Sequence, residues 1–245
     1  MPEIRTKRYW LIGASDGIGA ALAQELSALG AELILSGRRM DALQEVSRGL
    51  SMARCVDMDV SDSASVSRAA QSVGDVDGII YMAGYYQPMD AAQWDTAEAE
   101  RMIDVNLTGA LRVLGHVVPA FLAKNSGHIV LIGSLASYRG LPGAIGYSAS
   151  KAGLYSLAET LALDLHDTAV RVQVAHPGFV KTRLTDKNDF EMPFIQEPDQ
   201  AAAQIVKLMR SRAFSRAFPA PFSWVFRLSR LLPDRLYIRL FSKRT

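Results

Sequence analysis

Short runs of apolar residues alternate along the chain with stretches in which apolar residues recur every three or four positions. The apolar runs predict six strands, at 9–13, 32–36, 54–57, 78–82, 128–133 and 170–175. The helical stretches predict helices at 18–29, 40–48, 63–72, 97–124 and 147–166, the fourth bending near Thr108-Gly109. Because strands alternate with helices and are almost wholly apolar, the pattern predicts one doubly wound α/β domain, with helices on both faces of a parallel sheet.

The alternation ends after the sixth strand. Residues 179–199 carry charges, threonines and two prolines, which predicts a loop over a site. A helix capped by Asp199 is expected to run to about Ser211, and aromatic residues and leucines then mix with arginines to the end. We therefore divide the chain into an α/β domain, 1–213, and a basic, amphipathic helical extension, 214–245.

Composition fits one domain of 245 residues, 49% of them hydrophobic. Cys55 is the only cysteine, so no intrachain disulfide can form, and its place in an apolar strand predicts an inert core thiol. No apolar segment follows the charged residues at the start, which argues against a signal peptide, and no uncharged apolar run is long enough to span a bilayer. We expect a cytoplasmic protein that can touch a membrane.

Charge is distributed unevenly. Residues 207–245 hold ten of the 27 Lys and Arg residues but one of the 25 acids. Within this region, residues 221–244 place Trp, Phe and Leu among arginines, as in a helix that lies at a membrane interface. The segment is therefore expected to dock on an anionic membrane or to cap a lipophilic substrate pocket. The alternative is that it packs against the domain or a partner subunit with its arginines outward.

A glycine-rich turn follows the first strand and opens the first helix. It reads Gly13-Ala14-Ser15-Asp16-Gly17-Ile18-Gly19. Glycines let a backbone approach phosphates closely, and a helix N-terminus offers N–H donors and a positive dipole end. The turn predicts a Rossmann-type site for a dinucleotide pyrophosphate, against the alternative of a plain tight turn.

The second strand ends at Arg38-Arg39, where an NAD site usually has an acidic residue. Arginine can bind a 2′-phosphate through paired, charge-assisted hydrogen bonds, whereas a carboxylate would repel it. These residues favour NADP(H) over NAD(H), although they could merely begin a solvated helix. Asp16 argues mildly against a 2′-phosphate.

Tyr147 and Lys151 lie four residues apart at the start of a predicted helix and therefore share one face. A nearby ammonium lowers a tyrosine pKa, and a tyrosine so tuned can exchange a proton with a carbonyl oxygen. Ser134 follows the fifth strand, at the edge where ligands gather in parallel sheets. It could orient the substrate oxygen, or simply cap a turn.

The sequence gives little support for a metal site, a hydrolase or a nucleic-acid-binding protein. The four histidines and Cys55 show no metal-ligand spacing, so no metal site is expected. There is no GxSxG elbow of a hydrolase, and nothing resembles a nucleic-acid-binding module despite the basic end.

Taken in order, these motifs resemble the short-chain dehydrogenase/reductase family, in its shorter form, over about residues 6–210. The resemblance rests on the glycine turn, Ser134, Tyr147, Lys151 and four further motifs: Asp59-Val60, Ala83-Gly84, Asn106 in Val-Asn-Leu-Thr-Gly, and Pro177-Gly178-Phe179-Val180-Lys181-Thr182. It implies a seven-stranded sheet and a homodimer or homotetramer. Two positions depart from the family pattern, Ile12 for a threonine and Tyr81-Met82 for two asparagines, and both remove side-chain hydrogen bonds that brace cofactor loops.

The resemblance also implies roles. Tyr147 would be the acid/base, and Lys151 would tune it and hold the nicotinamide ribose. Ser134 would orient the carbonyl, and Asn106 would hold a water of a proton relay. The remaining family positions would contact the cofactor: Asp59 and Val60 at the adenine, Pro177, Gly178, Val180 and Thr182 at the nicotinamide end, and Ala83 and Gly84 as further contacts.

The function expected from these features is NADP(H)-dependent interconversion of a carbonyl and a secondary alcohol. Four apolar residues in the loops around the site hint at a lipophilic substrate: Leu141, Phe190, Phe194 and Ile195. The alternatives are a catalytically weak NADP(H)-binding sensor or scaffold, and a peripheral membrane protein in which the fold presents the basic tail.

Overall fold

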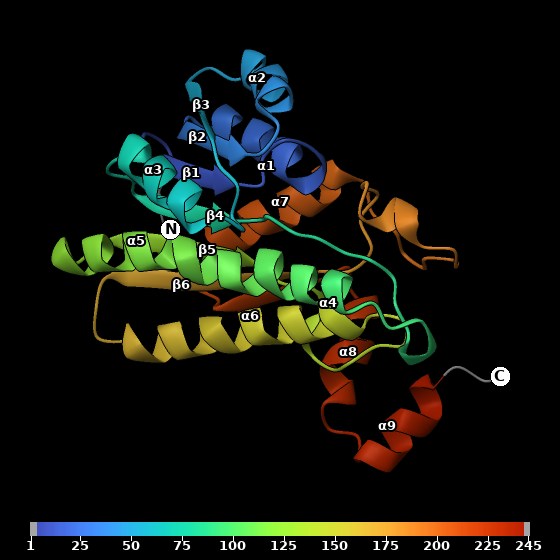
Figure 1. The fold of residues 1–245 in the computed structure, drawn as a ribbon. Helices are drawn as coiled ribbons and strands as arrows, with labels where there is room; N and C mark the ends of the chain where they lie inside the picture. Colours follow the sequence, from blue (N-terminus) through green and yellow to red (C-terminus); the bar gives the residue numbers. More distant parts are fainter. Residues whose placement is uncertain (1–3, 243–245) are drawn as a thin grey trace.

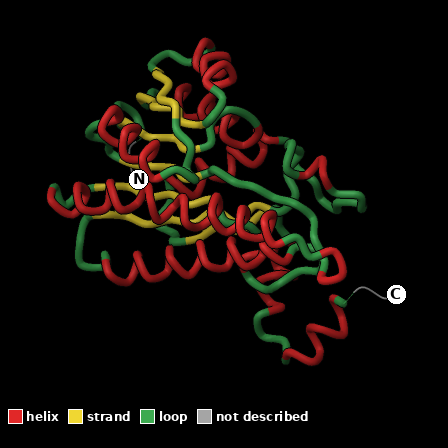
Figure 2. Tube along the Cα trace, viewed as in Figure 1, coloured by secondary structure: helices red, strands yellow, loops and turns green. Residues whose placement is uncertain are grey.

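Seven parallel strands form one sheet in the order β3-β2-β1-β4-β5-β6-β7 in the computed structural model, which describes residues 4–242 (Figure 1). The strands are β1 Arg8–Ile12, β2 Glu32–Gly37, β3 Ala53–Asp57, β4 Gly78–Tyr81, β5 Gly127–Ile132, β6 Val170–Pro177 and β7 Ser215–Phe218. Figure 2 shows them in yellow, with helices on both faces of the sheet. The seven-stranded, doubly wound fold expected from the sequence is confirmed.

Neighbouring side chains of each strand enter opposite helical layers. In β1, Trp10 and Ile12 pack with one cluster while Tyr9 and Leu11 pack with the other. The first layer contains α3 Ser63–Val73, α5 Gly109–Ala123 and α6 Ile145–Asp164, with α4 Thr96–Ile103 against α6. The second contains α1 Gly17–Ala28, α2 Met40–Arg48 and α7 Pro198–Met209. Strands buried on both faces explain the nearly continuous apolar runs.

The long helical run at 97–124 is broken by a wide turn. Between α4 and α5, residues Asp104–Thr108 form the π-helical turn η2, which places the discontinuity where the sequence predicts a bend. By length and hydropathy, Thr96–Ala123 could cross a membrane, but core helices of soluble proteins meet the same criterion. Here α5 covers the sheet through buried residues such as Val113 and Phe121.

The end of the chain departs from the predicted boundary. Strand β7 lies inside the segment 214–245 and pairs in parallel with β6, so the sheet continues beyond residue 213. Helices α8 Phe222–Ser229 and α9 Asp234–Phe241 follow it and lie at the rim of the molecule (Figure 1). Residues 243 and 244 of the expected amphipathic segment lie outside the described part. Asp199 is not the cap of α7 as expected, because the helix begins at Pro198 with Glu197 as its N-cap.

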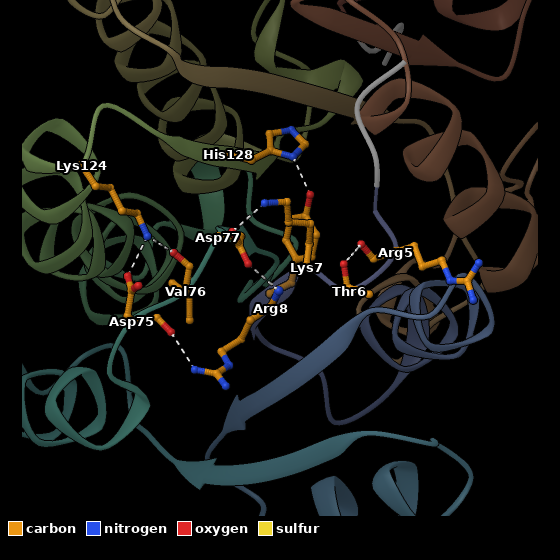
Figure 3. Close-up of polar contacts among 10 residues, drawn as sticks. Arg5, Thr6, Lys7, Arg8, Asp75, Val76, Asp77, Lys124 and His128 are labelled. Atoms are coloured by element: carbon orange, nitrogen blue, oxygen red, sulfur yellow. Dashed lines mark hydrogen bonds and ion pairs between the residues drawn. The ribbon is translucent and has the colours of Figure 1, made fainter.

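The amino-terminal edge of the sheet is closed by polar contacts (Figure 3). The Asp77 carboxylate accepts hydrogen bonds from the Lys7 ammonium at 3.0 Å and from the Arg8 N–H at 2.9 Å. Lys124 reaches both the Asp75 carboxylate and a backbone carbonyl at 2.6 Å. Burial raises the pKa of Asp77, but these hydrogen bonds and charges outweigh it, so the pKa lies below its usual value.

Candidate active site

A cavity of about 200 Å³ opens at the carboxyl-terminal edge of the sheet, where β1 and β4 end. The chain runs outward from β1 to β3 and then returns to β4 on the other side of β1, so this is the topological switch point where such folds bind ligands. Thirteen of the residues expected to contact a cofactor line it: Gly13, Ser15, Asp16, Gly17, Ile18, Gly19, Arg38, Arg39, Asp59, Val60, Ala83, Gly84 and Thr182.

The glycine turn leaves room for a diphosphate because side chains are excluded there. Gly13 has φ +91°, and a Cβ at this position would lie 2.6 Å from the Ala83 nitrogen. A Cβ on Gly19 would collide with the Gly13 carbonyl. The first residues of α1 line the same cavity, so the positive end of the helix dipole faces it. The donor set fits a pyrophosphate.

Charged side chains surround the rim where β2 ends. Arg38 is exposed and makes no salt bridge within residues 4–242, whereas Arg39 bonds the Asp16 carboxylate at 3.1 Å and the Ser15 hydroxyl at 3.2 Å. Arg183, which the sequence reasoning missed, pairs with the same Asp16 carboxylate. Two guanidinium groups therefore neutralise Asp16, which removes much of its expected conflict with a phosphate.

Asp59 lies at the far side of this cavity. Burial raises its pKa, but hydrogen bonds from the Ser61 hydroxyl at 2.6 Å and the Ser61 N–H at 2.9 Å, with the Arg38 charge, lower the pKa below the usual value. The carboxylate is therefore ionised at neutral pH and fixed in orientation.

Five expected cofactor contacts do not line the first cavity: Tyr147, Lys151, Pro177, Gly178 and Val180. Pro177 ends β6 and is buried, and Val180 is 3% exposed. Gly178 lines a second cavity of about 200 Å³, which also contains Ser134 and Tyr147. Leu184 lines both cavities, so the two adjoin.

Ser134 comes directly after the Gly133 that follows β5 and begins the short helix η3 Leu135–Ser137. Its hydroxyl accepts the Ala136 N–H at 3.1 Å, and its own N–H bonds the Ser137 hydroxyl at 3.1 Å. The hydroxyl also interacts with Tyr147 and lowers the pKa of that phenol. The capping role and the position beside Tyr147 therefore coexist in one side chain.

Tyr147 and Lys151 lie one turn apart on α6, largely buried. Burial raises the pKa of Tyr147, against the lowering effect of Ser134. This net direction is the reverse of the lowered pKa expected from the tyrosine–lysine pair, because desolvation dominates and the ammonium lies 5.9 Å from the ring centre. Lys151 donates to the Ile132 carbonyl at 2.8 Å, and burial lowers its pKa to about 8.

Asn106 lies in η2, fully buried, and its side chain makes no hydrogen bond to Tyr147 or Lys151. Its amide oxygen accepts the Tyr85 N–H at 2.7 Å, and its amide nitrogen donates to the Tyr85 carbonyl and the Ser150 hydroxyl, both at 2.9 Å. Ser150 in turn donates to the Tyr147 carbonyl at 2.8 Å. Asn106 thereby joins the loop after β4 to the start of α6.

Two tyrosines were missed as site residues. The ring of Tyr86 lies edge-on to that of Tyr147 at 5.0 Å, and its hydroxyl donates to Asn188 at 3.0 Å. Its position just after Ala83-Gly84 was the available signal. Tyr81, which departs from the family pattern, donates its buried hydroxyl to the Val105 carbonyl at 2.6 Å. It therefore supplies a brace between β4 and η2 that the sequence suggested was lost.

The second cavity is walled by aromatic side chains. Phe179 and Phe190 come from the loop after β6, and Phe222 and Phe226 come from α8. Leu141 also lines it, whereas Phe194 and Ile195 do not, although the Phe194 ring lies 5.5 Å from that of Phe222. Its lining includes one acid, Asp189, and no Lys, Arg or His. Within residues 4–242, no cluster of three or more His, Cys, Asp or Glu could hold a metal ion.

Comparison with known proteins shows which proteins this chain resembles in sequence and in fold. The sequence model of the family described as short chain dehydrogenase matches residues 7–192. The chain is 33% identical to an uncharacterized oxidoreductase of Myxococcus xanthus across 97% of both proteins. It is 29% identical to one of Mycobacterium tuberculosis, across 95% of this chain and 96% of that protein. A crystal structure of a short chain dehydrogenase from Burkholderia cenocepacia in complex with NADP has a TM-score of 0.89 at 22% identity, covering 99% of this chain and all of that one.

Proposed function

The chain belongs to the short chain dehydrogenase family and is an oxidoreductase of that kind, and from this premise we propose that it reduces a neutral, lipophilic ketone or aldehyde with NADPH. The observation that carries the proposal is the meeting of two cavities beside Tyr147. One is a glycine-lined cradle with an arginine rim, and the other is an aromatic pocket containing the Ser134 and Tyr147 side chains.

The cofactor would supply the hydride, held by the glycine turn at its diphosphate and by Arg38 at its 2′-phosphate. Tyr147 gives its phenolic proton to the carbonyl oxygen as that oxygen gains negative charge, and Ser134 donates a hydrogen bond to the same oxygen. A raised tyrosine pKa suits this direction, because the phenol is protonated before reaction. The Lys151 ammonium then favours the phenolate that remains.

Preference for NADPH rests on Arg38, which lines the first cavity and makes no salt bridge to the residues that the structure describes. Calorimetric titration should show tighter binding of NADPH than of NADH, and Arg38→Ala should weaken NADPH binding by about tenfold while changing NADH binding by less than about twofold. Arg68→Ala, at an exposed position on α3, is the matched control. Equal affinity for both cofactors in the native chain would refute the preference. Tight binding without turnover of any carbonyl would favour a sensor instead.

The aromatic walls of the second cavity and the absence of basic side chains from its lining support a neutral substrate. A carboxylate placed there would lose its hydration without gaining a cationic partner, and it would lie near Asp189. Turnover should therefore be higher for an aryl or alkyl ketone than for its ω-carboxylate analogue of equal length, by about tenfold or more in kcat/KM. Equal kcat/KM for the two would remove the argument for neutrality.

A further inference from the structure

Large apolar side chains are exposed together on α8, on α9 and on the turn between them. They are Trp224, Val225, Leu228, Leu231, Leu236, Ile238 and Leu240, with exposed fractions from 43% to 80%. Most other exposed hydrophobic residues are isolated, such as Met52 and Leu163, which is ordinary for a protein surface. Seven such residues within 17 positions are a concentration of exposed apolar side chains, and we term the exposed part of α8, α9 and the turn between them the tail surface.

The tail surface is also cationic. Arg227, Arg230, Arg235 and Arg239 are all exposed within it. The one acidic residue of this segment, Asp234, is held by the Arg139 guanidinium at 2.6 Å. Four positive charges thus accompany the apolar side chains without a local counter-charge of equal size.

Helix α8 has two distinct faces. Phe222 and Phe226, four residues apart, line the aromatic cavity, while Trp224 and Leu228, also four residues apart, are 57% and 60% exposed. Trp224 and Leu228 are therefore not needed to pack α8 against the domain, because the two phenylalanines already occupy its inward-facing positions.

Arg139 fixes the tail surface to the loop between Ser134 and Tyr147. It donates to the Ser229 and Leu232 carbonyls at 3.0 and 2.9 Å, and its guanidinium lies 4.1 Å from the Tyr237 ring centre. Tyr237 donates to the Gly140 carbonyl at 2.6 Å. The surface is therefore preformed, and little ordering would be needed for it to bind a partner.

We infer that the tail surface docks the protein on an anionic lipid bilayer. Arginines beside Trp and Leu match such a bilayer, in which phosphate head groups surround an accessible apolar layer. A second copy of the chain fits less well, since a two-fold contact would set each group of four arginines against its equivalent. The inference is independent of the proposed reaction, because it rests on residues that lie outside both cavities.

The test is co-sedimentation of the full chain with vesicles of phosphatidylcholine and phosphatidylglycerol, and with vesicles of phosphatidylcholine alone. The native chain should pellet with the anionic vesicles and be released by high salt. Since one arginine near an anionic surface is worth about fivefold in affinity, Arg235→Glu with Arg239→Glu should lower the affinity by more than about tenfold. Trp224→Ser with Leu228→Ser should also reduce pelleting. Arg68→Glu on α3 and Leu163→Ser on α6 are matched controls that should pellet like the native chain.

Tryptophan fluorescence gives a second readout. Trp10 is fully buried and Trp94 is 59% exposed, so in a Trp94→Phe background a blue shift on adding anionic vesicles reports Trp224. The inference is overturned if the native chain stays in solution with anionic vesicles. It is also overturned if the tail and control variants pellet equally. If the native chain does not pellet but Trp224→Ser with Leu228→Ser converts a dimer to a monomer in sedimentation equilibrium, the surface binds a second copy instead.

Discussion

The two edges of the sheet use polar residues in opposite ways. At the amino-terminal edge, Asp77 is paired with Lys7 and with a backbone N–H, and Lys124 is paired with Asp75. At the carboxyl-terminal edge, Arg38 makes no salt bridge within residues 4–242, and the Tyr147 phenol faces a cavity. The first arrangement satisfies the groups within the chain, whereas the second leaves them able to bind a ligand.

The difference shows that the residues that stabilise the fold and the residues that bind a ligand lie at opposite edges of the sheet. Polar groups that are satisfied internally contribute to the free energy of unfolding, while groups that await a ligand contribute little to it or, as buried charges, lower it. Substitutions at the two edges should therefore move different measurements. Four experiments test this separation, in order of expected size.

Tyr147→Phe should have the largest effect. Loss of the proton donor is expected to lower kcat by about 10²- to 10⁴-fold, with the melting temperature nearly unchanged. Steady-state kinetics with NADPH and a calorimetric scan would measure both. Tyr155→Phe, two turns further along α6, is the matched control and should keep kcat within about twofold. If Tyr147→Phe keeps its activity, the acid/base assignment is wrong.

The pH dependence of Lys151 comes next. Since burial lowers its pKa to about 8, the ammonium is present below that pH and is lost above it. The rate of carbonyl reduction should then fall by about tenfold for each pH unit above 8. A rate that stays constant above pH 8 would contradict a role for the charged lysine.

Stability should respond in the opposite direction. The folded-state pKa of Lys151 lies below the unfolded value of 10.5, so the buried ammonium destabilises the fold below pH 8, and this cost disappears as the pH rises to 10.5. Lys151→Met should therefore melt higher than the native chain at neutral pH and lose activity. Melting temperatures that differ equally at neutral and high pH would show that charge is not the cause.

Asp77→Asn should have the smallest effect and should act on stability alone. Its side chain is 36% exposed, which limits the loss to about 1 kcal/mol in urea unfolding, with kcat unchanged. Because the folded pKa is below 3.8, the stabilisation is present above that pH and is lost as the pH falls through the folded value. The native and variant curves should converge in acid. A fall in kcat at neutral pH would contradict the separation of the two edges.

The sequence predicts the elements whose positions follow from periodicity. Parallel strands end at one edge, so the residues after β1, β4 and β5 must gather there, and the glycine turn and Ser134 do so. Strand β7 was missed because its sequence, Ser-Arg-Ala-Phe, has no apolar run. An edge strand pairs on one side only, so it tolerates polar residues that an inner strand would not.

The rest depends on the paths of loops. The contact of Tyr86 with Tyr147 and the pairing of Arg183 with Asp16 join segments that are about 60 and 170 residues apart. The same holds for Phe222 and Phe226, since neither composition nor helical period indicates which surface α8 covers. The residue type at each of these positions does not indicate which distant segment it will contact.

Because of the wide turn η2, the packing of the side chains between α4 and α5 should be more sensitive to a change in the number of residues in the turn than to a change in their type. Each residue of an α-helix advances the side-chain direction by about 100°, and a π turn contains one residue more than an α turn. Deleting one residue between Asp104 and Thr108 would allow a continuous α-helix with α4 and α5 in nearly their present register, because the π turn accommodates the extra residue. The deletion would instead redirect the side chains inside the turn, and buried Asn106 would lose its place between Tyr85 and Ser150. Selection should therefore remove single-residue deletions in this turn far more strictly than substitutions at its half-buried positions.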